Sequence, residues 1–418
     1  MQTNLADFIK GTPEGDEADA ILRACVHCGF CTATCPTYQL LGDELDGPRG
    51  RIYLIKQTLE GVEPTRKTQL HLDRCLTCRN CESTCPSGVK YGRLADIGRR
   101  VVEERVARPL EDRVKRTMLK EFLPRGGLFK PAFKAGQAVR SLLPYELRDK
   151  LQPARPAGPW PRREHARKML VLAGCVQPAM APDINAATAR VLDSLGVQLI
   201  EAPKAGCCGA VRYHMNDQDG GLRDMRRNVD AWWPYVEGGQ VEAIVMTASG
   251  CGVTVKEYGH LLAQDPAYAA KAQRISEMTR DLSEILPDFQ DQIAARLAGK
   301  LSGKIGERVA FHPPCTLQHG QQIRGKVEGV LRAAGIDVVL CEDSHLCCGS
   351  AGTYSVLHPE IAHALRDDKL AKLEATGAKE IVSANVGCIS HLQSGTDTRV
   401  EHWIELLDRA LAGAAVTA

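Results

Sequence analysis

The second half of the chain alternates short apolar runs with amphipathic stretches, a pattern typical of parallel strands joined by helices. Residues 168–175 form an apolar run that ends in Cys175, and residues 308–315 form another that ends in Cys315. Each run precedes a helical pattern, a Gly that ends the helix, and a further strand. We therefore expect two α/β repeats with parallel sheets and right-handed crossovers.

The N-terminal part carries two cysteine-rich runs, at residues 25–36 and 75–86. Both read C-x2-C-x2-C-x3-C-P, the ferredoxin run for 4Fe–4S clusters, in which the fourth Cys ligates the other cluster. Structural zinc on C-x2-C pairs is the alternative, but zinc explains neither a third Cys nor the Cys-Pro ending. The first predicted ligand set is Cys25, Cys28, Cys31 and Cys85, and the second is Cys75, Cys78, Cys81 and Cys35.

A helix is expected between these two runs. The Gly- and Pro-rich residues 42–51 predict a loop, and the apolar residues after it open a helix that ends near Gly61. An inserted helix is typical of an α-helical ferredoxin domain rather than a minimal βαβ one. Arg49 and Arg51 of the loop either lie near a cluster and raise its potential or belong to a solvated loop that caps a helix.

The two repeats of the second half align on their cysteines. The first three cysteines of each repeat recur at an offset of 140 residues and the fourth at 137. Each set contains a Cys-Cys-Gly triplet, whose glycine permits a tight turn that directs both thiols into one pocket. Four convergent thiolates favour an additional cluster. The alternatives are cysteines buried as small apolar side chains and a redox-active pair of thiols. The eight cysteines are Cys175, Cys207, Cys208, Cys251, Cys315, Cys347, Cys348 and Cys388.

Composition narrows the classes of function. A net charge of +2 argues against a nucleic-acid binder. The 17 cysteines, an odd number in C-x2-C groups, favour metal ligation in the reducing cytoplasm over disulfides. The acidic N-terminus does not resemble a signal peptide, and no apolar run approaches the length of a membrane span.

Residues 103–168 are basic, with 17 Lys and Arg against 8 Asp and Glu. Apolar residues are interleaved with these charges, so the segment either touches a membrane surface or an acidic partner, or is a connector whose apolar face packs on its own domain. Pro124 and Pro131 interrupt any long amphipathic helix and favour the connector. Farther along, residues 265–297 predict one polar helix spanning the two repeats.

Motifs for a hydride acceptor are missing from the sequence. No G-x-G-x-x-G opens a helix after a strand, and neither a Ser/His/Asp elbow nor H-E-x-x-H occurs. The chain is therefore expected to move single electrons, and a two-electron substrate needs a flavin on another chain.

A family resemblance follows from the first cysteine run and the loop after it. The run reads Cys25-Val-His-Cys28-Gly-Phe-Cys31-Thr-Ala-Thr-Cys35-Pro, and the loop reads Asp-Gly-Pro-Arg-Gly-Arg. Both resemble the iron–sulfur subunit of bacterial glycolate oxidase (glycolate dehydrogenase), nearly over the whole chain. The Cys-Cys-Gly modules resemble the cysteine-rich domains of heterodisulfide reductase, although Thr254 and His391 replace the second Cys of the closing C-x2-C in those domains.

The resemblance implies an electron-transfer subunit without catalytic residues of its own. Partner subunits would carry FAD and oxidise glycolate to glyoxylate, and two 4Fe–4S clusters here would pass electrons to a quinone-type acceptor. It also implies peripheral contact with the cytoplasmic face of the inner membrane. The alternatives are the corresponding subunit of a D-lactate or glycerol-3-phosphate dehydrogenase, and a heterodisulfide-reductase-like thiol/disulfide enzyme.

The expected fold class is α+β overall. The predicted domains are an α-helical ferredoxin (4Fe–4S) domain at 1–110, a basic helical connector and Pro-rich linker at 111–166, a first Cys-Cys-Gly (CCG) cysteine-rich repeat at 167–300, and a second at 301–418.

Overall fold

The computed structural model describes residues 1–142, 151–298 and 307–416. The chain divides into two compact units, each built from separate stretches of sequence. The predicted boundary at residue 300 and part of the predicted connector lie outside the described residues, and the domain boundaries stay predictions. The first unit comprises Met1–Met118, His214–Asn216 and His345–Lys369; the second comprises Leu119–Tyr213, Asp217–Ser344 and Leu370–Ala418.

The first unit is helical, and a helix lies between the two cysteine runs as predicted. Proline occupies the first turn of α1, α2 and α3, where its missing N–H leaves no helical hydrogen bond unmade. The helices are α1 (Pro13–Ala24), α2 (Pro36–Leu41), η1 (Glu44–Asp46), α3 (Pro48–Leu59), α4 (Arg66–Asp73), α5 (Asn80–Thr84), α6 (Tyr91–Arg105) and α20 (Tyr354–Leu357).

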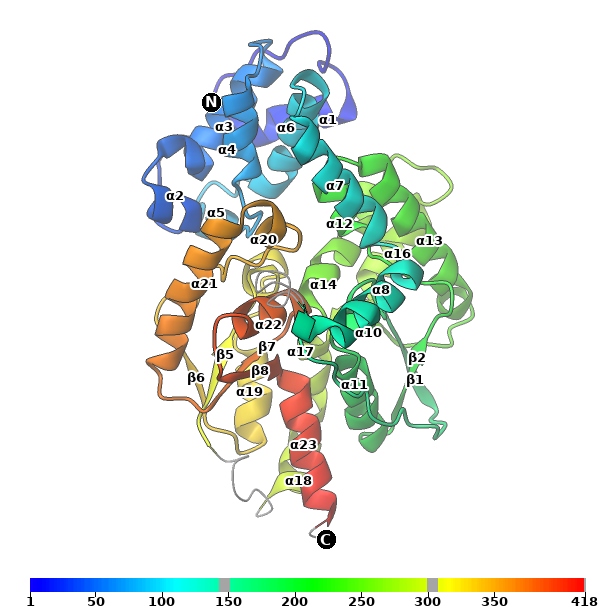
Figure 1. The fold of residues 1–418 in the computed structure, drawn as a ribbon. Helices are drawn as coiled ribbons and strands as arrows, with labels where there is room; N and C mark the ends of the chain where they lie inside the picture. The colour runs from blue at the N-terminus through cyan, green and yellow to red at the C-terminus, as the bar shows by residue number, and fades with distance from the viewer. Residues whose placement is uncertain (143–150, 299–306, 417–418) are drawn as a thin grey trace. The chain divides into compact units, whose positions relative to one another are not determined.

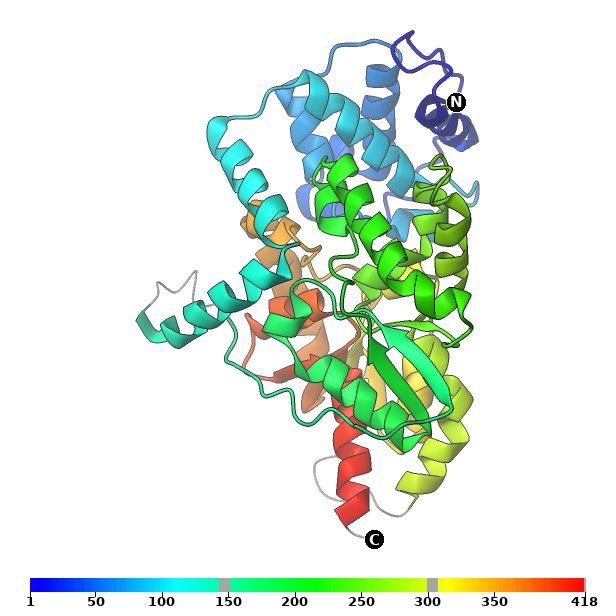
Figure 2. The same cartoon turned by 90° about the vertical axis from the view of Figure 1, so that its right-hand side faces the viewer.

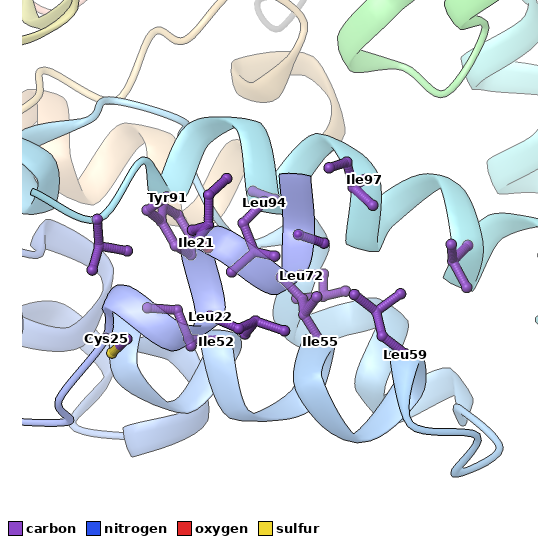
Figure 3. Packing of buried hydrophobic residues seen from close by; sticks show 14 of the residues in the cluster. Ile21, Leu22, Cys25, Ile52, Ile55, Leu59, Leu72, Tyr91, Leu94 and Ile97 are labelled. Atoms are coloured by element: carbon purple, nitrogen blue, oxygen red, sulfur yellow. The ribbon is translucent and has the colours of Figure 1, made fainter. Parts of the chain in front are cut away.

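The core of the first unit is formed by the apolar faces of α1, α3, α4 and α6 (Figure 3). Ile55 and Leu94 at its centre are fully buried, and Cys25 and Tyr91 belong to the same cluster of side chains. Burial of this apolar area fixes the helices that carry the cysteine runs. The side chains labelled in Figure 3 are Ile21, Leu22, Cys25, Ile52, Ile55, Leu59, Leu72, Tyr91, Leu94 and Ile97.

The second unit contains two parallel four-stranded sheets with the same topology (Figure 1). The strand orders are β2-β1-β3-β4 and β6-β5-β7-β8, so the sheets are matched strand for strand. This agreement confirms the predicted repeat and the α+β fold class. The strands are β1 (Arg167–Val171), β2 (Val197–Glu201), β3 (Ile244–Met246), β4 (Thr279–Asp281), β5 (Val309–His312), β6 (Val338–Leu340), β7 (Glu380–Ser383) and β8 (Arg399–His402).

Helices connect the parallel strands. Between β1 and β2, α11 packs on the first sheet (Figure 2) and ends before Gly196, whose φ of 83° turns the chain into β2. The remaining helices of the repeats are α10 (Gln177–Met180), α11 (Asp183–Ser194), α12 (Ala210–His214), α13 (Gln218–Glu237), α14 (Ser249–Lys256), α15 (Tyr258–Leu261), η5 (Thr316–Gly320), α19 (Lys326–Ala333), α21 (Pro359–Glu374), α22 (Val386–Gln393) and α23 (Trp403–Val416).

One helix prediction was wrong. The expected helix over 265–297 is divided into α16 (Ala269–Met278), the strand β4, α17 (Leu282–Ile285), η3 (Leu286–Phe289) and α18 (Gln290–Leu297). Strand β4 consists of Thr-Arg-Asp, and β8, which was not predicted either, consists of Arg-Val-Glu-His. These edge strands escaped prediction because they are short and polar, and pairing with β3 and β7 defines them.

The two repeats are joined by hydrogen bonds within the second unit. Ser249 donates its backbone N–H to the Ala384 carbonyl at 3.1 Å, and its hydroxyl lies 2.7 Å from the Thr316 hydroxyl. His402 at the end of β8 lies 2.9 Å from the Thr247 carbonyl through Nε2. These contacts fix the carboxyl-end loops of one sheet against those of the other.

The basic segment contains α7 (Leu110–Phe122), α8 (Gly126–Ala138) and η2 (Arg140–Leu142). Phe129 and Phe133 of α8 pack with Ala179, as predicted for a connector, and Pro131 lies inside α8 rather than ending it. Four apolar side chains of α7 are instead exposed, namely Leu110, Val114, Met118 and Phe122. Because Leu119 is half-buried and the Phe122 ring contacts Phe129, the prediction that the segment packs on its own domain is only partly met. No helix in the described ranges is long and apolar enough to cross a membrane.

Candidate iron–sulfur sites

A hollow in the first unit is lined by five cysteines taken from both runs. Four of them, Cys25, Cys28, Cys31 and Cys85, form the first predicted ligand set, and the fifth is Cys81 of the second set. Cys28 is exposed and Cys25 is buried, so this hollow, named here the first hollow, reaches the surface of the unit. Burial, followed by the neighbouring thiols, raises the pKa of Cys31 to about 11, as expected for sulfur atoms crowded around one space.

A second hollow is lined by four cysteines of the two runs. They are Cys35, Cys75, Cys78 and Cys81, the second predicted set. Cys35, Cys75 and Cys81 are buried, so the second hollow is deeper than the first. Pro48, Cys81 and Tyr91 line both hollows, which therefore adjoin.

Left-handed backbone conformations shape both cysteine runs. His27 and Thr77 stand at equivalent positions and have φ of 56° and 52°. The next equivalent pair, Gly29 and Arg79, also has positive φ, at 87° and 60°. Non-glycine residues rarely adopt this conformation, and they cluster where function requires it. Repeated turns bend each C-x2-C-x2-C segment around its hollow.

Arg51 lies in the interior beside the second hollow. Its side chain is 1% exposed and donates to the His71 carbonyl at 2.7 Å, to the Thr37 hydroxyl at 3.1 Å and to Asp46 at 3.3 Å. The Thr37 hydroxyl in turn lies 3.3 Å from the Cys35 sulfur. The predicted loop over residues 42–51 is shorter than expected, because α3 already begins at Pro48 and contains Arg51. Of the two alternatives predicted for this arginine, the structure supports the one that places it near a sulfur site.

Arg49 differs from Arg51 in its exposure. It lines the first hollow, but its side chain is 37% exposed and is paired with Glu44 at 2.6 Å, which is 40% exposed. Water and Glu44 together screen most of its charge from the first hollow.

Arg99 is a functional candidate that the sequence analysis did not identify. This buried residue of α6 donates to the Cys75 carbonyl at 2.6 Å and to the Thr77 hydroxyl at 2.9 Å. A charged residue within the buried, mostly apolar face of an amphipathic helix was the available signal. Burial raises the pKa of Cys75, but the charges of Arg51 and Arg99 outweigh it, and the pKa falls below its usual value.

These residues fit the demands of a 4Fe–4S group, which requires four thiolates and hydrogen-bond donors to sulfur. Each hollow has a complete set of four cysteines. The backbone N–H of Thr77 donates to the Cys75 sulfur at 3.4 Å. Burial and the neighbouring Cys75 raise the pKa of Tyr91, so its hydroxyl, between the two hollows, stays a neutral donor.

The first Cys-Cys-Gly repeat brings its four thiols together within the second unit. Sulfur contacts run in series from Cys175 to Cys207, from Cys207 to Cys208, and from Cys208 to Cys251. We call these four residues the first quartet. The contact with Cys207, then burial, raises the pKa of Cys175 far above its usual value. Raised pKa values keep Cys175, Cys207 and Cys208 in the neutral thiol form. The quartet lies at the carboxyl end of a parallel sheet, where such sheets place their sites.

Neutral hydrogen bonds hold the Cys-Cys-Gly loop of the first quartet. Tyr258 donates its hydroxyl to the Cys208 carbonyl at 2.8 Å, and Asn228 donates to the Cys207 carbonyl at 2.8 Å. Gly209 has φ of 93°, and a Cβ there would lie 2.7 Å from the Gly221 carbonyl oxygen. Only glycine meets both conditions without strain.

The second set of four cysteines is divided between the two units. Cys347 and Cys348 belong to the first unit, and Cys315 and Cys388 to the second. All four are buried. Gly349 matches Gly209, with φ of 86° and space for a Cβ only 2.4 Å from the Ala362 carbonyl oxygen. The repeat therefore extends to the local geometry of the two Cys-Cys-Gly triplets.

Two known protein families match this architecture. The family described as "4Fe-4S dicluster domain" matches residues 21–89, which include both cysteine runs. The family described as "Cysteine-rich domain" matches twice, at residues 169–256 and 309–393. The fold and the sulfur sites thus define a class of iron–sulfur proteins in which a two-cluster ferredoxin domain precedes two cysteine-rich repeats.

Individual relatives identify the family. The chain is 54% identical over 413 residues to the "Glycolate oxidase iron-sulfur subunit" of Escherichia coli K12, covering 98% of this chain and 99% of the relative. It is 30% identical to the "Probable glycolate oxidase iron-sulfur subunit" of Bacillus subtilis, covering 90% and 89%. It is 25% identical to "Lactate utilization protein A" of Bacillus velezensis over 58% of this chain. The chain belongs to the family of glycolate oxidase iron–sulfur subunits, which confirms the resemblance.

Proposed function

We propose that this chain is the electron-transfer subunit of a complex that oxidises glycolate to glyoxylate. The oxidation releases two electrons and two protons, and it takes place on partner subunits that carry FAD. This chain receives the electrons one at a time and delivers them to a quinone-type acceptor at the cytoplasmic face of the inner membrane. The chain is 54% and 30% identical to two glycolate oxidase iron–sulfur subunits over most of their length. This similarity supports glycolate over a D-lactate or glycerol-3-phosphate complex.

The proposed ligands are the two crossed sets of cysteines. Iron–sulfur clusters supply single-electron transfer when bound there. The observation that carries the proposal is that cysteines of both runs line each hollow, and that all four members of one predicted crossed set line the first hollow and all four of the other line the second. Cys25, Cys28, Cys31 and Cys85 would hold the first cluster, and Cys75, Cys78, Cys81 and Cys35 the second.

Paired Cys→Ser substitutions test the crossed sets directly. Cys28→Ser with Cys85→Ser removes two ligands of one set, so the full chain, purified anaerobically, should lose one cluster and keep the other. Cys28→Ser with Cys35→Ser removes one ligand from each set and should lose both. Iron and sulfide content and electron paramagnetic resonance (EPR) of the reduced protein report the outcome. The reverse result would support uncrossed sets, and a colourless zinc protein would refute the proposal.

The cysteines of the repeats are proposed to hold a further cluster. In the first quartet the contacts among Cys175, Cys207, Cys208 and Cys251 support this role. By the repeat symmetry, Cys315, Cys347, Cys348 and Cys388 are the candidates in the second set. Cys208→Ser should then lower the iron content below that of the unaltered chain. An unchanged iron content, with disulfide reduction by the isolated chain, would instead favour a thiol/disulfide enzyme.

Helix α7 is the proposed point of contact with the membrane surface. Leu110, Val114, Met118 and Phe122 recur every four residues and are exposed, which makes one apolar edge along the helix. The surrounding segment 103–168 carries an excess of nine positive charges, which suits anionic lipid. Met118→Glu should weaken sedimentation with anionic vesicles, whereas Lys115→Ala should weaken it less. If the unaltered chain and the two variants bind the vesicles equally, this contact is refuted.

A further inference from the structure

The surroundings of the two hollows differ although the cysteine runs are near-copies. Two residues after Cys35 and Cys75 stand Thr37 and Thr77, and each accepts a hydrogen bond from a buried arginine. The equivalent positions after Cys25 and Cys85 are His27 and Ser87. Ser87 is exposed, and the arginine beside the first hollow is half-exposed and paired with Glu44. Within the described ranges, buried arginines therefore lie beside the second set of cysteines and not beside the first.

The two buried arginines contact different cysteines of the second set. Arg51 reaches the Cys35 sulfur through the Thr37 hydroxyl, by contacts of 3.1 and 3.3 Å. Arg99 binds the Cys75 carbonyl and the Thr77 hydroxyl, while the Thr77 N–H points at the Cys75 sulfur. The cation pair therefore acts on a cysteine of each run.

Neighbouring acids offset only part of this charge. Buried Asp73 and Asp96 interact with the charge of Arg99. Asp73, however, is also paired with two other arginines, Arg108 and Arg116. Asp46 lies between two arginines, at 3.3 Å from Arg51 and 2.9 Å from Arg74, so this group of three keeps one positive charge. The guanidinium of Arg99 donates its hydrogen bonds to neutral oxygen atoms, those of the Leu72 and Cys75 carbonyls and the Thr77 hydroxyl. Burial disfavours added negative charge, but the same low dielectric strengthens the attraction of the arginines.

We propose that the second site holds its cluster at a higher reduction potential than the first, and that Arg51 and Arg99 create the difference. The inference rests on the proposed function. Reduction adds one electron and breaks no bond, and positive charge and hydrogen bonds to sulfur favour the reduced state. Electrons that reach the first site therefore collect at the second. Arg51 and Arg99 are positioning residues, since they touch the ligands rather than the metal.

An EPR-monitored titration of the full chain with dithionite tests this order. The two sites should give two midpoints in the unaltered protein, separate from any signal that Cys208→Ser removes. Because Cys28→Ser removes a ligand of the first set, the midpoint that persists in that variant identifies the second site and should be the higher of the two. Equal midpoints, or a lower midpoint at the second site, would overturn the inference and leave the proposed function intact. The absence of any reducible centre would overturn both.

Substitution of Arg99 tests the cause. Arg99→Gln should make the reduced second site about tenfold less favoured, a shift of about 59 mV for one electron, without moving the first midpoint. Arg99→Lys keeps the positive charge, so its second-site midpoint should stay close to that of the unaltered protein. Arg49→Gln is the matched control, with a smaller effect confined to the first site. If Arg51→Gln does not fold, the double variant Arg51→Gln with Asp46→Asn removes the arginine and its carboxylate partner together. No shift in any arginine variant would refute the assignment.

Discussion

The two cysteine runs and the first quartet bring sulfur atoms together in opposite surroundings. Around the second hollow the buried partners are charged, with Arg51, Arg99 and Asp46 in the interior. Around the first quartet the buried partners are neutral, namely Asn228 and Tyr258. Arg227 also donates to the Cys207 carbonyl at 3.1 Å, but its side chain is 41% exposed. The pKa follows this difference: it is lowered at Cys75, where arginine charge outweighs burial, and raised at Cys208, where contact with Cys251 and burial outweigh the contact with Cys207.

The difference teaches how a fold prepares thiols for different tasks. Helices bring long cationic side chains from distant turns to the second set of cysteines. Their charge stabilises the Cys75 thiolate, whereas burial and the neighbouring thiols still raise the pKa of Cys81 in the same set. The sheet of the first repeat supplies fixed loops at its carboxyl end but no buried cation to the quartet among the described contacts. A metal bound by the quartet must therefore displace protons without that electrostatic help.

The largest expected effect is the loss of a buried charge in the helical unit. Asp46 is fully buried and accepts hydrogen bonds from Arg51 and Arg74, so Asp46→Asn leaves both guanidinium groups without their carboxylate and should cost about 3–5 kcal/mol. Denaturant unfolding of the anaerobic chain measures it. Glu44→Gln breaks the exposed pair with Arg49 and should cost at most about 1 kcal/mol. Similar losses in both variants would show that buried charge is not what holds this unit.

Next in size is the backbone strain at the quartet. Gly209→Ala places a methyl 2.7 Å from the Gly221 carbonyl oxygen at a positive φ, and it should lower the free energy of unfolding by about 2–4 kcal/mol. Gly239→Ala is the control, because φ there is 60° but the space is open; about 1 kcal/mol is expected. Equal costs would mean that the close approach at Gly209 relaxes without effect.

The neutral interior of the second unit should also show in its pH dependence. Burial lowers the pKa of His402 to about 3, against the opposing hydrogen bond with the Thr247 carbonyl. A depressed folded pKa of a histidine means that stability is lost as pH falls below the unfolded pKa of about 6.5, and the loss reaches about 2 kcal/mol at pH 5. His402→Gln keeps a donor for Thr247 without titrating, so its stability should vary less over this range. An unchanged pH profile would contradict the assignment.

The smallest effect concerns one neutral hydrogen bond. Tyr258→Phe leaves the Cys208 carbonyl without the donor it has at 2.8 Å and should cost about 1 kcal/mol. Tyr268→Phe removes an exposed bond to Asp230 and should stay within about 0.5 kcal/mol. Thermal unfolding of the two variants side by side measures the difference. If Tyr268→Phe costs as much, the buried loop has no special dependence on Tyr258.

Most of the fold and of the candidate site could be predicted from the spacing of residues that are close together in the sequence. The cysteine runs and the period of the apolar segments are properties of neighbouring residues, so the helical domain and the paired α/β repeats could be predicted. Arg99 lies 24 residues beyond Cys75 and reaches it only because α6 packs against the core, which no local pattern encodes. The edge strands β4 and β8 are likewise defined by their partners, since three or four polar residues indicate no strand alone.

The exposed apolar side chains of α7 have a practical consequence for the isolated polypeptide. Four apolar side chains in a row on one helix give two molecules a surface on which to adhere. The chain produced alone should therefore self-associate as its concentration rises, and co-production with the rest of its complex, or the Met118→Glu variant, should keep it dispersed.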